Sequence, residues 1–254
     1  MVETTLKHRA NLKVQRPARP SNISDGLSGW MDGTDTFVPG PHWHDHESAI
    51  RSAIGEYDRN LRGVAGYRSP DFALMKAMMW TENDPGDVTW NSRPMHIGNS
   101  GDGGLRDLLK PEGAGTVIIP PQWQNGLAAR ASSNPQDNIR AGIGYVLSIA
   151  SQSDMRTVIA PGAPIFEVEA AKGDTLDKIA KIYGSTTDHL RRLNGSSLLR
   201  PHQRVKVQKA RVERVILSWK NIDKYLLQQK YNTKTLTHYP EKIQYILDYI
   251  RLYP

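Results

Sequence analysis

The 254-residue sequence contains no cysteine, which excludes disulfide bonds and removes the usual sequence indicator of redox compartment. It also contains no apolar run near the ~20 residues that cross a bilayer, so we expect no membrane span. Residues 1–20 carry basic side chains but no apolar segment. This pattern predicts that the chain has no secretory signal peptide and is made in the cytoplasm.

Positive charge is distributed unevenly along the chain. Residues 161–254 hold 17 Lys and Arg against 9 Asp and Glu, whereas residues 1–160 hold 16 against 17. A basic C-terminal part suits an anionic cell-wall polymer, a membrane surface or nucleic acid, and it also suits a merely solvated surface. The basic residues form no recognition helix or aromatic strand motif, so we expect no nucleic acid partner.

The first candidate for catalysis lies at the end of an apolar segment that begins at Ala73. Apolar residues at helical spacing predict a helix that ends at Glu82, because the Asn-Asp-Pro-Gly sequence at 83–86 stops it. The negative end of the helix dipole and the apolar surroundings are both expected to raise the pKa of Glu82. A carboxyl group that is protonated near neutral pH can act as general acid in glycosidic cleavage. The alternative is an ordinary solvated glutamate at a helix end.

Two further segments accompany this helix. Met95-His96-Ile97-Gly98-Asn99 leads into a Gly-rich turn at 100–104, where the backbone can approach a ligand closely. Residues 134–147 predict a capped helix that carries Asn138, Ile139, Ala141, Gly142 and Tyr145. Together, residues 48–153 resemble the soluble lytic transglycosylase branch of the lysozyme-like superfamily. That family has a helix ending in a catalytic Glu, a Gly-containing turn in the cleft, and an NI–AG––YL helix whose Tyr faces the Glu.

This resemblance implies an α-helical, lysozyme-like domain that cleaves the β-1,4 bond between N-acetylmuramic acid and N-acetylglucosamine. Glu82 would protonate the leaving oxygen and then act as base on the muramoyl 6-hydroxyl, while Tyr145 would orient the carboxyl group. The substrate-binding residues that it implies are Met95, Gly98, Asn99 and Asn138. The chain departs from the family pattern at Asn83, where Ser is usual, and at His96, where Gln is common.

Hydrolysis would instead require a second carboxylate, to activate water or stabilise the oxocarbenium ion. Asp102 in the Gly-rich turn is the first candidate for this catalytic role, and Asp87 is the second. Both outcomes stay open. The rival from another class is a non-catalytic peptidoglycan-binding structural protein built on the same scaffold. The acid at the helix end argues against it.

A second resemblance covers residues 165–208. Alternating residues at 166–169, two short helical patterns and a closing strand at 204–207 predict a βααβ order, with Asp174 as a helix N-cap. The segment contains the patterns GDTL–KIA–––G and L––LN, and with them it resembles the lysin motif (LysM) module, which binds N-acetylglucosamine-containing glycans. The groove residues that this implies are Gly173, Asp174, Thr175, Leu176, Leu199 and the rest of 198–201. His202 stands where the family usually has Gly.

The sequence therefore predicts a mainly α protein in four parts: a flexible basic arm over 1–40, a lysozyme-like domain over 41–160, a LysM module over 165–208 and a helical tail over 209–254. The lysozyme-like domain is expected to act without the residues beyond Pro161. In the tail, apolar stripes at 212–226 and 243–253 predict two helices that fold against either module or dock a partner.

Three histidines at 42, 44 and 46 surround Asp45 and form the one arrangement that suggests zinc. No further ligand motif accompanies them, so we expect Asp45 to cap the following helix, and we expect no metal and no other cofactor.

Peptidoglycan lies outside the cytoplasmic membrane, so an enzyme made without a signal peptide must reach it by another route. We therefore predict an exported antibacterial effector or a phage lytic protein that acts in the periplasm or cell wall. Its expected partners are peptidoglycan glycan strands and either a secretion-machine component or an inhibitor (immunity) protein.

Overall fold

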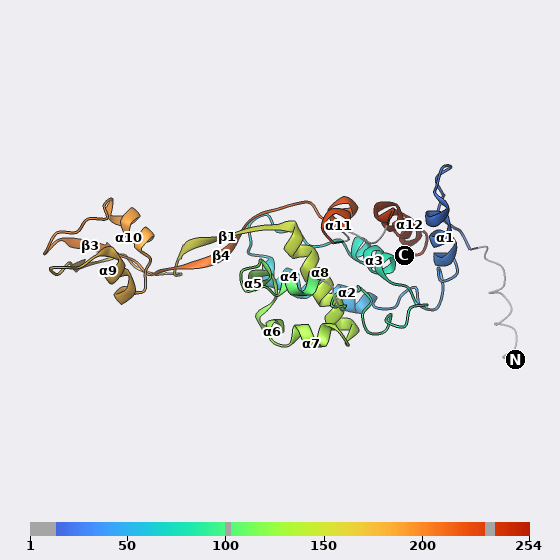
Figure 1. Ribbon diagram of the computed structural model, residues 1–254, viewed down its shortest axis with the longest axis horizontal. Helices are drawn as coiled ribbons and strands as arrows, with labels where there is room; N and C mark the ends of the chain where they lie inside the picture. The colour runs from blue at the N-terminus through green and yellow to red at the C-terminus, as the bar shows by residue number, and fades with distance from the viewer. Residues whose placement is uncertain (1–13, 100–102, 232–236) are drawn as a thin grey trace, which may run out of the picture. The chain divides into compact units, whose positions relative to one another are not determined.

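The computed structural model describes residues 14–99, 103–231 and 237–254, and Figure 1 shows the order of their elements. These residues form two compact units. The larger unit combines the chain up to Gln152 with the segment from Ser218 onward, and the smaller unit spans Ser153–Leu217. The smaller unit is therefore an insertion, and the chain returns to the larger unit after it. This division differs from the four consecutive parts that the sequence predicts.

Helices make up the larger unit, so the prediction of a mainly α protein is confirmed. They are α1 (Asp25–Thr34), α2 (Glu47–Leu61), α3 (Phe72–Glu82), α4 (Gly104–Leu108), α5 (Gly115–Ile118), α6 (Pro121–Gln124), α7 (Leu127–Ala131), α8 (Pro135–Ala150), α11 (Lys224–Lys230) and α12 (Tyr239–Leu252). Two of them organise the rest: α3 packs against α2 and α12, and α8 packs against α2, α4, α5 and α7.

Helix α3 is buried on nearly all sides, as expected for a helix that is apolar all round. Its N-cap Asp71 accepts a hydrogen bond from the backbone N–H of Leu74 at 2.7 Å, and its last residue is Glu82, as predicted. Lys76 lies inside this apolar helix, 1% exposed, with its Nζ 2.6 Å from a carboxylate oxygen of Glu47. Because a buried cation needs a partner, this ion pair fixes α3 against α2.

Helix α8 forms the second support of the larger unit. Its N-cap Asn134 accepts a hydrogen bond from the backbone of Asp137 at 3.0 Å, and Pro135 occupies the first helical position. The predicted apolar stripe of Ile139, Ile143 and Val146 is fully buried.

Within the described residues 14–40, the segment before α2 is not the flexible arm that the sequence predicts over 1–40. Residues 14–40 contain α1 and are anchored by Asp35, whose side chain is 2% exposed. Arg16 and Arg19 form ion pairs with this carboxylate, and the hydroxyls of Tyr245 and Tyr249 on α12 donate to it at 2.8 and 2.6 Å. These partners offset the free-energy cost of burying the charge of the Asp35 carboxylate. Residues 1–13 lie outside the described part of the chain.

The predicted helix over 212–226 is wrong. This segment instead contains strand β4 (Ala210–Trp219), which pairs with β1 (Ser151–Ile159) in a two-stranded sheet, followed by α11. Val212, Val215 and Ile216 are β-branched and suit a strand, although their spacing also fits a helix. The second predicted tail helix is confirmed as α12, and it packs on α3 in the larger unit.

The smaller unit contains the βααβ module that the sequence predicts, over residues 166–207, together with most of β1 and β4. Strand β2 (Phe166–Glu169) pairs antiparallel with β3 (Arg204–Val207), so that Phe166 faces Val207 and Glu169 faces Arg204. Helices α9 (Leu176–Tyr183) and α10 (Thr187–Asn194) complete it. Its core consists of Ala170, Leu176, Ile179, Ala180, Leu190, Val205 and Val207.

Candidate functional site

Glu82 is half-buried at the C-terminal end of α3, and its carboxyl group meets the first residue of α12. The Tyr239 hydroxyl donates a hydrogen bond to Glu82 Oε1 at 2.5 Å. Tyr239 is 0% exposed. Burial, followed by the nearby charge of Glu82, raises the pKa of Tyr239 well above its ordinary value. The phenol therefore keeps its proton near neutral pH and acts as a donor to Glu82.

A buried cation lies one turn further along α12. Lys242 is 7% exposed, and its Nζ is 5.3 Å from the centre of the Trp30 ring. Burial lowers the pKa of Lys242, while the charge of Glu82 acts in the opposite direction. Lys242 and Glu82 are therefore electrostatically coupled, and the first turn of α12 supplies both a donor and a positive charge to the carboxyl group.

The loop that follows α3 is held by the side chain of Asn138 on α8. Its Oδ1 accepts from the backbone N–H of Met95 at 2.9 Å, and its Nδ2 donates to the carbonyls of Ile97 and Ala131 at 2.8 and 2.7 Å. A Cβ added at Gly142 would lie 2.5 Å from the Met95 sulfur. The Asn and the Gly of the α8 pattern thus allow this loop to pack directly on the helix.

Of the four residues that the sequence places at the substrate, two are buried supports of this loop. Met95 and Asn138 are both 0% exposed. Gly98 and Asn99 are half-buried, and Gly98 has a φ of 83°, which favours glycine. The Asn99 Oδ1 atom is buried and has no hydrogen-bond partner among the residues described. The loop therefore offers Gly98 and Asn99, rather than Met95 and Asn138, toward the surface.

Tyr145 is half-buried and packs against a core cluster that includes Ile97, Leu108 and Ala141. Its ring centre is 5.4 Å from that of Tyr231, whose hydroxyl donates to the Met95 carbonyl at 2.9 Å. Tyr231 follows α11, so it belongs to the segment that returns after the inserted unit. The returning segment thus reaches the same loop and helix as the predicted site residues.

The sequence alone does not indicate Tyr231, Tyr239 or Lys242 as residues of the candidate site. Six of the ten tyrosines lie between residues 225 and 253. This density is a signal for a returning segment, but it does not indicate which tyrosine meets Glu82.

Asn83 and His96, where the chain departs from the family pattern, meet at Thr89. Asn83 is buried and donates to Thr89 Oγ1 at 3.1 Å, and the His96 Nε2 atom lies 3.3 Å from the same oxygen. Burial lowers the pKa of His96, and the charge of Asp87 opposes this effect. Hydrogen bonds from the Thr89 side chain and backbone lower the pKa of Asp87, so this carboxylate is ionised near neutral pH. Asp102 lies outside the described residues.

The three histidines before α2 are the residues for which the sequence raises the question of zinc. No group of three metal-ligating side chains that could hold an ion occurs among the residues described. Asp45 does not cap α2 as predicted; the N-cap is His46, which makes no side-chain capping bond. Asp45 Oδ2 instead lies 2.7 Å from His42 Nδ1 and accepts from the Trp90 indole at 3.2 Å.

In the smaller unit, the implied groove residues lie in the loop before α9 and in the segment after α10. Gly173 is exposed with a φ of 87°, and the N-cap of α9 is Thr175 rather than the predicted Asp174. Asp174 accepts from the Ala171 backbone at 2.8 Å. Leu176 is 2% exposed and belongs to the core. Leu199 packs partly against this core, and its neighbour Leu198 is 82% exposed.

Two side chains fix the ends of this groove region. Asn194 donates to the carbonyls of Leu190 and Lys206 at 2.8 and 2.9 Å, and it accepts from the Lys206 backbone at 2.8 Å. His202 keeps the left-handed conformation expected of the usual Gly, with a φ of 67°, and its Nδ1 lies 2.6 Å from Glu169 Oε1. The backbone at this turn into β3 thus has the left-handed conformation that glycine adopts most readily.

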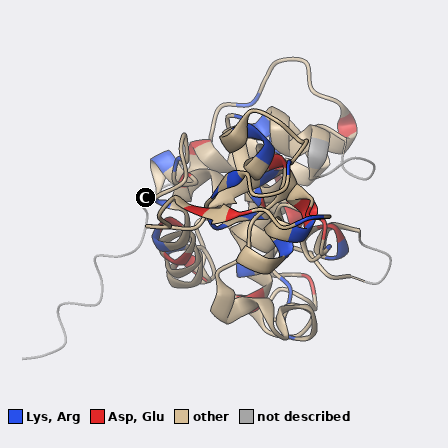
Figure 2. Cartoon of the chain, turned by 90° about the vertical axis from the view of Figure 1, so that its left-hand side faces the viewer, with Lys and Arg blue, Asp and Glu red and all other residues tan. Residues whose placement is uncertain are grey.

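This geometry agrees with a match to a known family. Residues 170–208 match the LysM domain model. This match indicates peptidoglycan binding by the LysM domain. No curated protein and no solved structure matches the chain. The unit that contains the LysM domain, Ser153–Leu217, holds twelve Lys and Arg against seven Asp and Glu. Figure 2 shows Lys and Arg interspersed with Asp and Glu along the ribbon of the chain.

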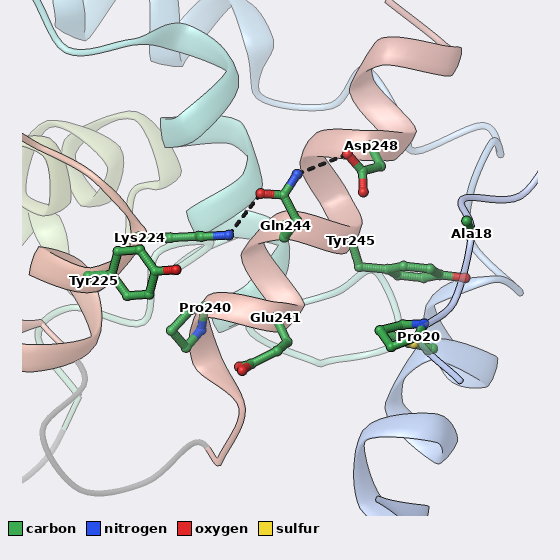
Figure 3. Close-up of a pocket in the computed structure, with 10 residues that line it drawn as sticks. Ala18, Pro20, Lys224, Tyr225, Pro240, Glu241, Gln244, Tyr245 and Asp248 are labelled. Carbon is green, nitrogen blue, oxygen red and sulfur yellow. Dashed lines mark hydrogen bonds between the residues drawn. The ribbon is translucent and has the colours of Figure 1, made fainter. Parts of the chain in front are cut away.

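A separate groove lies on the other side of α12. Figure 3 shows it between residues 18–20 and the exposed face of α12, where Lys224 donates to Gln244 and Gln244 donates to Asp248, each at 2.9 Å. Its cavity volume is about 180 Å³. At helical spacing, Glu241, Gln244 and Asp248 lie opposite Tyr239 and Lys242, so the body of α12 separates this groove from Glu82. In the residues described, no helix is long and apolar enough to cross a membrane.

Proposed function

We propose that the larger unit is a peptidoglycan-cleaving enzyme of the lytic transglycosylase or muramidase type, which the LysM domain holds on its substrate. The observation that supports this most directly is the carboxyl group of Glu82, half-buried at the end of an apolar helix and hydrogen-bonded to buried Tyr239. A positioned carboxyl group, in a chain that also carries a LysM domain, suits general acid–base cleavage of a glycan.

In the proposed reaction, the Glu82 carboxyl group donates its proton to the glycosidic oxygen between N-acetylmuramic acid and N-acetylglucosamine. The bond from that oxygen to muramoyl C1 breaks, and C1 develops oxocarbenium character. The Glu82 carboxylate then takes the proton from the muramoyl 6-hydroxyl, whose oxygen bonds to C1 and closes the 1,6-anhydro ring. Glu82 is regenerated in its acid form, so no second carboxylate is needed. Tyr145 would orient the sugar and the carboxyl group.

The muramidase outcome uses the same first step and then water. A second carboxylate would deprotonate that water or stabilise the cation, and Asp102 is the candidate for it. The two outcomes differ in their products, because hydrolysis leaves reducing ends and the lytic route leaves anhydro ends. In Asp102→Asn, a loss of activity as large as that of a Glu82 variant supports hydrolysis, and a mild loss supports the lytic route.

The experiment that tests the proposal compares two Glu→Gln variants on purified peptidoglycan sacculi. Glu82→Gln keeps the size of the side chain but removes the transferable proton, so muropeptide release should fall by about 10²- to 10⁴-fold. Glu241→Gln changes an exposed glutamate on the other side of α12 and should release muropeptides at the wild-type rate. Mass spectrometry of the products identifies their ends. Release by Glu82→Gln at the rate of Glu241→Gln would contradict the proposal.

A non-catalytic wall-binding protein is the second candidate. It is favoured by the fact that the family match covers only residues 170–208. It predicts that the wild-type protein pellets with sacculi and releases no muropeptides over the concentration range in which it is bound. The same assay therefore decides between the two candidates.

We further propose that the protein acts as an exported effector or phage lytic protein, with an inhibitor or a secretion component as partner. Its substrate lies beyond the cytoplasmic membrane, so toxicity to a bacterial host should require delivery to the periplasm. The test is expression with and without an added signal peptide, using Glu82→Gln as control. Equal toxicity of both forms, or toxicity of the exported Gln variant, would contradict this role.

A further inference from the structure

We propose that Tyr239 is a positioning residue for Glu82, supplied by the chain after it has passed through the LysM-containing insertion. Its hydroxyl fixes the Glu82 carboxyl group and strengthens its bond to that group as the carboxylate forms. This inference rests on the proposed function of Glu82 as general acid.

The contact itself has the features of a strong hydrogen bond. The Tyr239 oxygen lies 2.5 Å from Glu82 Oε1, and the phenol is 0% exposed. Hydrogen bonds from a hydroxyl to a carboxylate are the short ones, at about 2.5–2.7 Å. Because the phenol has no exposed surface, bulk water does not compete with it as the donor to Glu82. The carboxyl group of Glu82 therefore has one oxygen whose position is determined by α12.

The helix that carries Tyr239 is fixed independently of this contact. Ile243 and Ile246 on α12 are both 0% exposed, and the helix packs along α3. Further along, Tyr245 and Tyr249 donate to the buried carboxylate of Asp35. These distant anchors hold α12 in place, so removal of the Tyr239 hydroxyl alone should leave the helix where it is.

The charges around Glu82 have opposite effects on its ionisation. The C-terminal end of α3 disfavours the carboxylate, whereas the N-terminal end of α12 favours it. The Tyr239 donor and the positive charge of Lys242 also favour the carboxylate. In the reaction Glu82 passes from acid to carboxylate, so these groups interact more strongly with the transition state than with the starting acid. An interaction of this kind increases kcat rather than substrate affinity.

The test compares Tyr239→Phe with Tyr249→Phe on a soluble glycan substrate. Each variant removes one buried hydroxyl from α12, but only Tyr239 reaches Glu82. We expect Tyr239→Phe to lower kcat by about 10- to 100-fold with KM little changed, because the carboxyl group is no longer held in its reactive position. Tyr249→Phe should keep the wild-type kcat. Equal kcat values for the two variants would overturn the inference.

The pH profile gives a readout that loss of packing would not change. Glu82 must be protonated to act as acid, so the rate falls as pH rises through its ionisation. Without the donor the carboxylate is less stable, and the alkaline limb should move upward by about one pH unit in Tyr239→Phe. Lys242→Met should move the limb in the same direction. An unmoved limb in Tyr239→Phe would overturn the inference, whatever the result for Lys242→Met.

A titration without turnover separates this inference from the proposed function. Glutamate ¹³C-carboxyl NMR, with Glu82→Gln to assign the signal, reports the ionisation of Glu82 directly. An upward shift in Tyr239→Phe and none in Tyr249→Phe supports the contact even if the wild-type protein cleaves no glycan, a result that would overturn only the proposed function. Identical titrations in the two variants would overturn the inference.

Discussion

The two units of this protein are held together by contacts between residues at very different separations along the sequence. In the LysM domain, Asn194 bonds to Lys206, a residue 12 positions away, and the whole matched motif spans residues 170–208. In the larger unit, Glu82 bonds to Tyr239 across 157 positions, and Asp35 bonds to Tyr249 across 214. A short sequence motif includes both partners of a contact such as the one in the LysM domain, so the contact can be predicted from the motif. For the contact between Glu82 and Tyr239, the sequence shows the catalytic candidate but not the residue that meets it.

The two units also share a structural feature, an asparagine side chain that is hydrogen-bonded to the backbone. Each contains an asparagine that makes three hydrogen bonds to backbone groups: Asn138 to Met95, Ile97 and Ala131 in the larger unit, and Asn194 to Leu190 and Lys206 in the LysM domain. Asn138 belongs to the NI–AG––YL match and Asn194 belongs to the L––LN match. Asn138 is fully buried, whereas Asn194 is half-buried. The comparison can therefore be tested with the same substitution in both units.

The largest effect is expected from where the chain is cut. Ending it at Pro161 removes α12, so α3 loses its cover and Glu82 loses Tyr239. Excising Ser153–Leu217 instead keeps both parts of the larger unit. The ends are adjacent, because Ser218 Oγ donates to Gln152 Oε1 at 2.9 Å, and an Asn-Gly turn should join them. We expect the truncated chain to show no cooperative thermal unfolding by circular dichroism, and the excised chain to unfold cooperatively.

The excised chain also isolates the contribution of the LysM domain. It should cleave soluble glycan fragments at the full-length rate but pellet weakly with sacculi, because the second contact with the wall is gone. A truncated chain as stable and active as the excised one would show that the larger unit does not need its returning segment. Equal pelleting of the excised and full-length proteins would contradict the binding role of the LysM domain.

An intermediate effect is expected from the two asparagines. Asn138→Ala leaves three buried backbone groups without a partner and should destabilise the larger unit by about 3 kcal/mol. Asn194 is half-buried, so water can replace the hydrogen bonds that its backbone partners lose in Asn194→Ala. This substitution should destabilise the LysM domain by about 1 kcal/mol. Scanning calorimetry of the full chain should show each substitution lowering a different transition. A loss of stability in the wrong unit, or the reverse order of the two effects, would contradict the assignment.

The smallest effect is expected at His202. Its left-handed backbone conformation favours glycine in the folded state. Glycine also increases the conformational entropy of the unfolded chain, which lowers the free energy of unfolding by about 0.4–1 kcal/mol. The bond from His202 to Glu169 joins side chains that are 84% and 64% exposed, so it contributes little. His202→Gly should therefore change the LysM transition by less than about 1 kcal/mol and leave sacculus binding unchanged. A larger loss in either measurement would show that the imidazole itself has a role.

The sequence predicts those structural features correctly that depend on residues within one helix or one short motif. The end of α3 at Glu82, the capped helix α8 and the βααβ order of the LysM domain all follow from local spacing, stop signals and N-caps. The same local rules miss a cap by one residue when two candidates are adjacent, as with Asp174 and Thr175. They failed at Asp45, because a tertiary partner, the Trp90 indole, takes the carboxylate that would have capped α2.

The remaining differences have tertiary causes. The apolar residues of β4 fit helical spacing as well as a strand, and only pairing with β1 decides between them. Residues 14–40 have a composition typical of a loose arm, yet Asp35 provides a buried partner for Arg16 and Arg19. For the candidate site, the sequence indicates Glu82 and Tyr145. It does not indicate Tyr239 or Lys242, because nothing local relates them to a helix that precedes them by so many residues.

The inserted position of the LysM domain also sets an order for folding during synthesis. The LysM domain has mostly local contacts and can fold as soon as it leaves the ribosome, whereas α3 must wait for α12, which is made later. Once folded, the insertion holds residues 152 and 218 together, so the returning segment closes a short gap instead of a long flexible loop. The LysM domain is thus complete before the proposed catalytic centre, which is assembled only after the returning segment has been made.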